Sequence, residues 1–149
     1  PLRQRYRLME LQRWREARRL PLAIRPKYWP FDVARAGRLV VAAQIAGEDA
    51  GRLAGACFRA VFAQERDLGD AATLAAILAE NGLDPGLLAA ADGAEARAVY
   101  DATPAEALAA GVFGSPSWAL DGEIFWGQDR LELLDSALGS GRTPYSAEV

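Results

Sequence analysis

The stretch that decides the fold is residues 111–131, which read GVFGSPSWALDGEIFWGQDRL. Residues 117–120 and 123–126 are short, largely apolar and aromatic runs of the kind that form strands. Asp121-Gly122 separates them and predicts a two-residue hairpin turn. Gly127 follows, and a helix is predicted from about Asp129 to Leu138. Because two strands alone make a poor sheet, this hairpin needs partner strands, and the rest of the chain supplies no convincing ones.

The chain before this stretch has helical patterns. Apolar spacing, caps and breakers predict helices over residues 5–19, 32–46, 49–65, 70–80, 85–91 and 94–110. Between the first two, residues 22–30 contain two prolines and are predicted to be an extended connector. Pro104 is expected to interrupt the last of these helices, with Thr103 capping a restart. Residues 139–149 are predicted to be a polar, mobile tail.

The composition excludes several kinds of chemistry. The 149 residues include one cysteine and no histidine, so the chain holds no internal disulfide, no CxxC pair and no histidine-dependent nucleophile. A zinc site with several Cys or His ligands is excluded as well. Any catalysis must therefore use hydroxyls, carboxylates, backbone amides or a borrowed cofactor. A single free cysteine also fits a reducing, cytoplasmic setting, and no apolar run is long enough to span a membrane.

Charge is distributed unevenly along the chain. Residues 1–27 hold nine basic and two acidic residues, a balance of +7, whereas the remainder holds eight basic and eighteen acidic residues, a balance of −10. We interpret the basic segment as a solvated helix face, because no nucleic-acid-binding motif accompanies it. The alternatives are a surface for nucleic acid or anionic lipid and a site for a small anionic ligand beside this helix.

The G-x-x-G-x-P loop at residues 111–116 resembles the cis-proline loop of thioredoxin-fold proteins. With the D-G turn and the F-W-G-Q-D-R-L run of residues 125–131, the stretch is similar to the 2-hydroxychromene-2-carboxylate isomerases. These are relatives of kappa-class glutathione transferases and DsbA-like oxidoreductases. The opening segment, with Tyr6, Trp14 and the Leu-Pro-Leu of residues 20–22, agrees with this resemblance. The R-D-x-x-D turn at residues 66–70 also agrees.

The resemblance implies an α/β fold, with a thioredoxin-like core and an inserted all-helical domain. This chain would then be mostly helical with one C-terminal hairpin. Residues 1–30 would be the first helix and connector, 31–110 the helical insertion, 111–138 the thioredoxin-like hairpin and helix, and 139–149 a flexible tail. The family's first strand, first helix and second strand are expected to precede Pro1. That segment carries the family's catalytic serine, so no catalytic residue is assigned here.

The resemblance also implies a function. The family's isomerases bind glutathione and isomerise a small aromatic carboxylate through a glutathione adduct, and relatives are often homodimers. Neither a nucleic acid nor a membrane is an expected partner, and no metal is expected. Two alternatives stay open: a non-catalytic thioredoxin-like or helical binding protein, and a DsbA-like thiol–disulfide oxidoreductase whose CxxC lies upstream.

Five residues match family positions that hold glutathione. Ser115 precedes the expected cis-proline, Pro116, and its backbone would hold the cysteinyl part. Gln128 and Asp129 match a polar pair that grips the γ-glutamyl end, although either could simply cap the last helix. Arg3 matches a lysine that meets the glycyl carboxylate, and a solvated charge is the alternative.

Four residues match positions near the substrate. Tyr28, Trp29 and Asp32 fall in a segment that lines the family's substrate pocket, and Asp32 stands where asparagine is usual. Its carboxylate would repel a carboxylate substrate unless it is protonated or paired, and it could instead cap a helix. Trp126 could touch an aromatic substrate or belong to the core. Cys57, beside Phe58 on an apolar helix face, is predicted to be buried packing.

Overall fold

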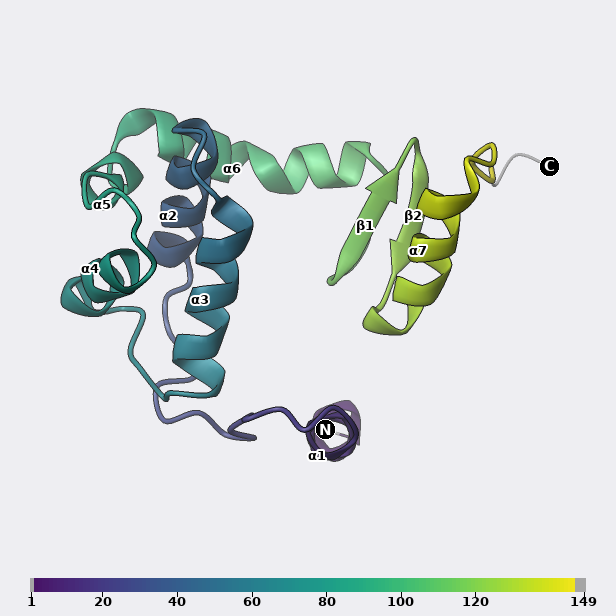
Figure 1. Cartoon of the computed structure of the whole chain (residues 1–149), viewed down its shortest axis with the longest axis horizontal. Coiled ribbons are helices and arrows are strands. Elements are labelled where there is room, and N and C mark those ends of the chain that lie inside the picture. The colour runs from purple at the N-terminus through teal and green to yellow at the C-terminus, as the bar shows by residue number, and fades with distance from the viewer. Residues whose placement is uncertain (1, 147–149) are drawn as a thin grey trace. The chain divides into compact units, whose positions relative to one another are not determined.

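A computed structural model of the protein describes residues 2–146. The chain divides into two compact units, unit 1 up to Tyr100 and unit 2 from Asp101 onward. Helices dominate, and one antiparallel hairpin lies near the C-terminus (Figure 1). This matches the predicted fold class of a mostly helical chain with a single C-terminal hairpin.

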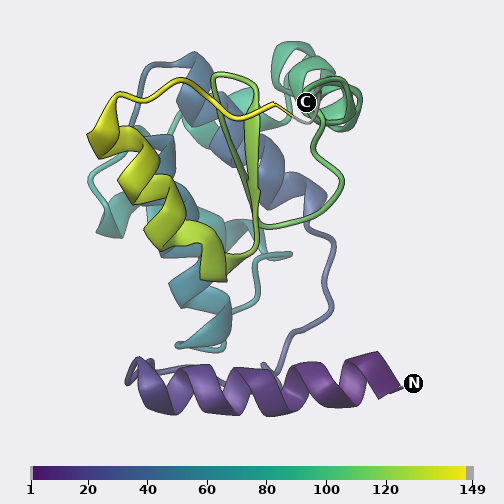
Figure 2. The same cartoon turned by 90° about the vertical axis from the view of Figure 1, so that its right-hand side faces the viewer.

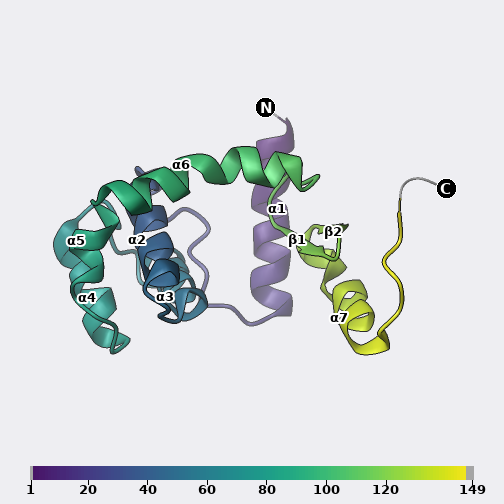
Figure 3. The same ribbon diagram turned by 90° about the horizontal axis from the view of Figure 1, so that it is seen from above.

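Unit 1 consists of helices joined by short turns and one extended connector (Figure 3). The helices are α1 (Leu2–Ala17), α2 (Ala34–Ile45), α3 (Ala50–Phe62), α4 (Ala71–Glu80), α5 (Leu87–Ala91) and α6 (Ala94–Ala109), the last of which continues into unit 2. Each helix lies within a few residues of its predicted range. Gly47 and Gly82 follow α2 and α4 with φ of +72° and +64°, as the glycine stop signals predict.

The core of unit 1 is aliphatic. Helix α2 packs against α3 and α5, and α3 packs against α4. The largest side chains that are fully buried there are Leu39, Leu53, Leu74, Ile77 and Leu78. Helix α1 contributes none, since no residue of Leu2–Ala17 is buried.

Polar contacts fix the ends of these helices. Asp49 caps α3 by accepting a hydrogen bond from the Arg52 N–H at 2.8 Å. Asp70 caps α4 by accepting from the N–H groups of Ala72 and Thr73 at 3.2 and 3.1 Å. These hydrogen bonds, with one from the Thr73 hydroxyl, hold the pKa of Asp70 below its usual value.

The predicted interruption at Pro104 is wrong. Helix α6 runs without a break from Ala94 to Ala109, with Pro104 inside it. Proline has no N–H, so the carbonyl of Tyr100, four residues earlier, loses its usual helical donor. The bonds on either side maintain the helix, and no restart occurs at Thr103.

Unit 2 contains the predicted hairpin and a helix packed beside it (Figure 2). Strands β1 (Ser117–Leu120) and β2 (Glu123–Trp126) pair antiparallel, with Ser117 opposite Trp126. Asp121 and Gly122 both have positive φ, +49° and +86°, as a two-residue hairpin turn requires. A 3-10 turn, η1 (Gln128–Arg130), leads into α7 (Leu131–Ser140). Phe125 of β2 and Ala137 of α7 are buried in this unit.

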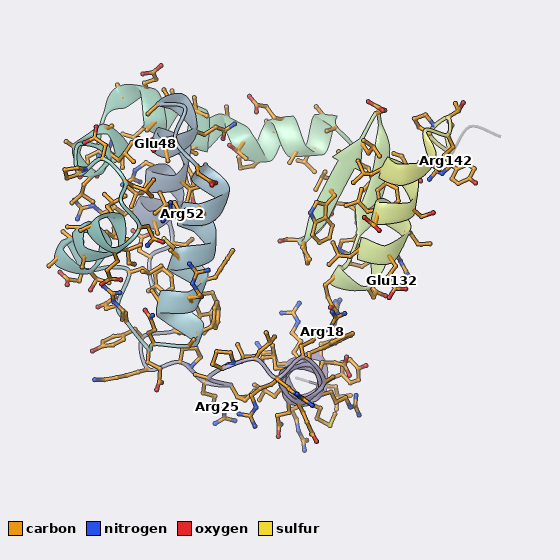
Figure 4. All side chains as sticks on the ribbon, in the orientation of Figure 1. Arg18, Arg25, Glu48, Arg52, Glu132 and Arg142 are labelled. Carbon is orange, nitrogen blue, oxygen red and sulfur yellow. The ribbon has the colours of Figure 1, made fainter. Side chains whose placement is uncertain are left out.

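The segment after α7 is attached to the hairpin. Helix α7 continues to Ser140, two residues past its predicted end at Leu138. Arg142, labelled in Figure 4, donates from Nη1 and Nη2 to the two carboxylate oxygens of Glu123, each at 2.8 Å. The Tyr145 N–H also donates to Glu123, at 3.0 Å. We call these three groups the Glu123 clasp. The remaining tail residues, 147–149, lie outside the described part of the chain.

Among the described residues, none of the helices is long and apolar enough to cross a membrane.

Candidate functional site

The loop between α6 and β1 carries the predicted cis-proline. The Ser115–Pro116 peptide bond is cis, in agreement with the geometry that the resemblance implied. Ser117 steadies the loop by donating from Oγ to the Gly114 carbonyl at 2.7 Å. Ser115 is exposed, and within residues 2–146 neither its N–H nor its C=O makes a hydrogen bond. The loop therefore presents a free donor and a free acceptor to solvent.

The hairpin register places Gln128 and Asp129 beside this loop. Because Ser117 pairs with Trp126, the next residues outward, Pro116 and Gly127, lie opposite each other. The Gly127 N–H donates to the Pro116 carbonyl at 3.0 Å. The following Gln128 and Asp129 are exposed, and Asp129 forms a loose ion pair with Arg130, at 3.5 Å. Four of the five predicted glutathione-binding residues thus come together in unit 2.

Two glycines let the backbone approach closely at this site. A Cβ at Gly114 would lie 2.6 Å from Nε1 of Trp126, so the loop lies directly on the indole ring. Gly127 has φ +109° and ψ +143°, a conformation that essentially only glycine adopts. A Cβ at Gly127 would also overlap the Asp129 carboxylate.

Trp126 is a surface residue of the site. Its side chain is 51% exposed, and its ring meets that of Phe113 edge-on with centroids 5.0 Å apart. The predicted alternative, that Trp126 belongs to the core, is therefore wrong. No sequence pattern signals this contact, because Phe113 lies inside the G-x-x-G-x-P loop and Trp126 ends the second strand of the hairpin.

Tyr28, Trp29 and Asp32 lie together on the connector of unit 1. The Lys27 ammonium lies 4.9 Å from the Tyr28 ring centroid. Trp29 packs against Phe31 and Phe62, with centroids 5.6 and 5.7 Å away. Asp32 accepts a hydrogen bond from the Ala34 N–H at 2.9 Å, so one carboxylate oxygen satisfies the first backbone N–H of α2. The predicted capping role is thus displaced by one residue, because Val33 occupies the N-cap position of α2 without a side-chain cap hydrogen bond and Asp32 precedes it.

Arg3 lies on α1 in unit 1 and is exposed, with no described hydrogen bond or ion pair. It shares neither element nor unit with the loop and the polar pair of unit 2.

Cys57 lies on α3 and is 7% exposed, so the predicted burial is confirmed. Burial raises the pKa of its thiol, which keeps the sulfur protonated at neutral pH. The described part of the chain also contains no group of three or more Cys, Asp or Glu side chains able to hold a metal ion. The polar chemistry of this site therefore comes from backbone groups, an amide and a carboxylate.

Three comparisons relate this chain to known proteins. A family model described as a DSBA-like thioredoxin domain matches residues 1–139. Curated protein sequences gave no match. Among solved structures, a selenomethionine 2-hydroxychromene-2-carboxylate isomerase (HCCA isomerase) is similar, with a TM-score of 0.75 and 26% sequence identity. The match covers 93% of this chain and 67% of that one.

Proposed function

The chain belongs to the DSBA-like thioredoxin domain family. From this premise we propose that it acts as a glutathione-dependent isomerase. The observation that carries the proposal is the similarity to the HCCA isomerase structure over 93% of the chain. The exposed cis-proline loop and its neighbouring polar pair support it, since both are available to a ligand.

The residues of unit 2 fit glutathione chemically. The free N–H and C=O of Ser115, next to Pro116, would hold the cysteinyl part of the tripeptide by backbone hydrogen bonds. The Asp129 carboxylate would pair with the ligand's ammonium, and the Gln128 amide would hydrogen-bond its α-carboxylate. Arg3 is proposed for the glycyl carboxylate, which a guanidinium can bind with two parallel hydrogen bonds.

Bound glutathione would supply a nucleophilic thiol, which the buried, protonated Cys57 of this chain does not offer. The substrate proposed is a small aromatic carboxylate. Within unit 2, Trp126 offers exposed aromatic surface to its ring system, and within unit 1 the exposed aromatic candidates are Tyr28 and Trp29. Asp32, which accepts a hydrogen bond from the Ala34 N–H, would keep the substrate carboxylate away from the start of α2, because like charges repel.

The other hypotheses receive less support from these residues. Thiol–disulfide exchange needs a pair of reactive cysteines, and this chain contributes one buried thiol. A non-catalytic binding protein would use the cis-proline loop to hold a ligand but would not convert a substrate. Homodimerisation and a cytoplasmic location remain predictions.

Titration calorimetry with glutathione tests the ligand site. We expect the wild-type protein to bind, and Asp129→Ala to weaken binding about tenfold or more, because a charge-assisted hydrogen bond is worth about 1.5–3 kcal/mol. Gln128→Ala should weaken it less. Asp135→Ala is the matched control, since it removes an exposed carboxylate from α7 itself. Affinity that is unchanged in Asp129→Ala would contradict the assigned site.

A kinetic assay tests the reaction. Conversion of 2-hydroxychromene-2-carboxylate is followed by absorbance, with and without added glutathione. We expect turnover only when glutathione is present. Glutathione binding without turnover would favour the binding-protein alternative, and the absence of both would refute the proposal.

A further inference from the structure

Unit 1 contains an apolar cavity that shares one lining residue, Trp29, with the isomerase proposal and none of its other residues. It has a volume of about 250 Å³ and lies between the connector, α2 and α3. Four aromatic rings contribute to its walls, those of Trp29, Phe31, Phe58 and Phe62. We call it the α2–α3 cavity.

The lining of the α2–α3 cavity is uncharged. None of its twelve described lining residues is acidic or basic. Its one titratable group is the Cys57 thiol, which is neutral because burial raises its pKa. An ionised group placed there would lose its hydration without gaining a partner. The cavity therefore selects for a neutral occupant.

The dimensions limit the size of that occupant. An apolar cavity of about 150 Å³ in a protein interior is large enough to bind benzene. A volume of about 250 Å³ therefore has room for two fused aromatic rings.

The arrangement of the rings favours a flat aromatic guest. Trp29 meets Phe31 at an interplanar angle of 76° and Phe62 at 44°, so ring faces and ring edges are both presented. Edge-to-face and offset contacts of this kind stabilise aromatic pairs beyond the area that they bury. The Cys57 sulfur adds a polarizable contact.

The cavity also has apolar surface left in water. Trp29 is 51% exposed and Phe58 is 65% exposed, although both line it. Covering this surface releases free energy in proportion to the apolar area removed from water. A bound ring would cover part of both side chains.

We propose that the α2–α3 cavity is a binding site for a neutral aromatic molecule of one or two fused rings. This goes beyond the proposed function, because it requires neither glutathione nor any residue of unit 2.

The test uses 2-naphthol as the neutral ligand and 2-naphthalenesulfonate as its charged counterpart, titrated calorimetrically without glutathione. We expect 2-naphthol to bind and the sulfonate to bind at least about tenfold more weakly. Ala54→Phe fills the cavity from α3 and should weaken 2-naphthol binding about tenfold or more. Ala75→Phe adds the same ring at an exposed position of α4 outside the cavity, and should leave binding unchanged.

A second pair of variants locates the ligand without disturbing the core. Phe58→Ala removes an exposed wall of the cavity and should weaken binding, whereas Phe113→Ala removes an equally exposed ring of unit 2 and should not. Two results would overturn the proposal. One is an absence of 2-naphthol binding to the wild type. The other is loss of binding in Phe113→Ala with retention in Phe58→Ala, which would place the ligand at the Phe113–Trp126 pair.

Discussion

Replacing Gly127 by alanine tests how the hairpin presents Asp129. Gly127 joins β2 to η1, and its N–H holds the Pro116 carbonyl. Its backbone has φ +109° and ψ +143°, and an added Cβ would overlap the Asp129 carboxylate. The substitution therefore strains the backbone and displaces the side chain that we assign to the ligand's ammonium.

The magnitude follows from these two effects. Holding a residue other than glycine in such a conformation costs about 1–3 kcal/mol, so the free energy of unfolding should fall by roughly that amount. The overlap itself adds little, because the Asp129 side chain is 57% exposed and can rotate away. That rotation should nevertheless weaken glutathione binding about tenfold, since a charge-assisted hydrogen bond is worth about 1.5–3 kcal/mol.

The assay combines urea unfolding, followed by circular dichroism, with glutathione calorimetry. Gly122→Ala is the matched control, because Gly122 also has a positive φ, +86°, but no atom within 4 Å of an added Cβ. Both variants should lose stability, and only Gly127→Ala should lose affinity. Equal affinity losses in the two variants, or none in Gly127→Ala, would refute the reasoning.

Four further predictions concern the rest of the chain. Leu53→Ala should lower the free energy of unfolding in urea by about 2–5 kcal/mol, because Leu53 is fully buried in the core of unit 1. Pro104→Ala should raise the free energy of unfolding by about 2 kcal/mol in the same assay, because it restores a helical N–H donor within α6. Hydrogen bonds from the Arg142 guanidinium hold the pKa of Glu123 below its usual 4.5. At low pH the unfolded chain therefore binds more protons than the folded chain. The stability that Glu123 contributes should be complete above about pH 5 and lost as the pH falls through the lowered pKa; urea midpoints should show this loss in the wild type and not in Glu123→Gln. Cys57 should react with maleimide slowly in the native protein and rapidly in urea, as mass spectrometry would show, because it is 7% exposed and burial raises its pKa.

Much of the fold could be predicted from local chemistry. Asp70 and Gly82 mark the ends of α4 because a carboxylate cap and a positive φ act within one turn of the helix. The Asp121-Gly122 turn defines the whole hairpin register, since a two-residue loop leaves one way to pair the strands. That register in turn brings Pro116 opposite Gly127. The close approach of the loop to the polar pair was thus implicit in the sequence.

What could not be predicted depends on contacts between distant segments. Pro104 is typical of a helix end, yet α6 continues from Ala94 to Ala109 with Pro104 inside it. The Arg142–Glu123 ion pair joins residues 19 apart and has no local pattern that signals it. The α2–α3 cavity arises because the connector places Trp29 against Phe62 of α3. Periodicity assigned Cys57 to an apolar face, but it could not show that this face is incompletely filled.

The Glu123 clasp has a consequence for how unit 2 opens. Glu123 belongs to β2 and Arg142 follows α7, so their ion pair closes a ring of chain that contains the second strand, η1 and the helix. A two-stranded hairpin is marginal by itself, and fraying normally begins at chain ends. Here the segment at residues 141–146 cannot detach without freeing the turn end of the hairpin. Amide hydrogens of β2 and α7 should therefore exchange with solvent as one cooperative block, and the strand beside the cis-proline loop gains its protection from the far end of the unit.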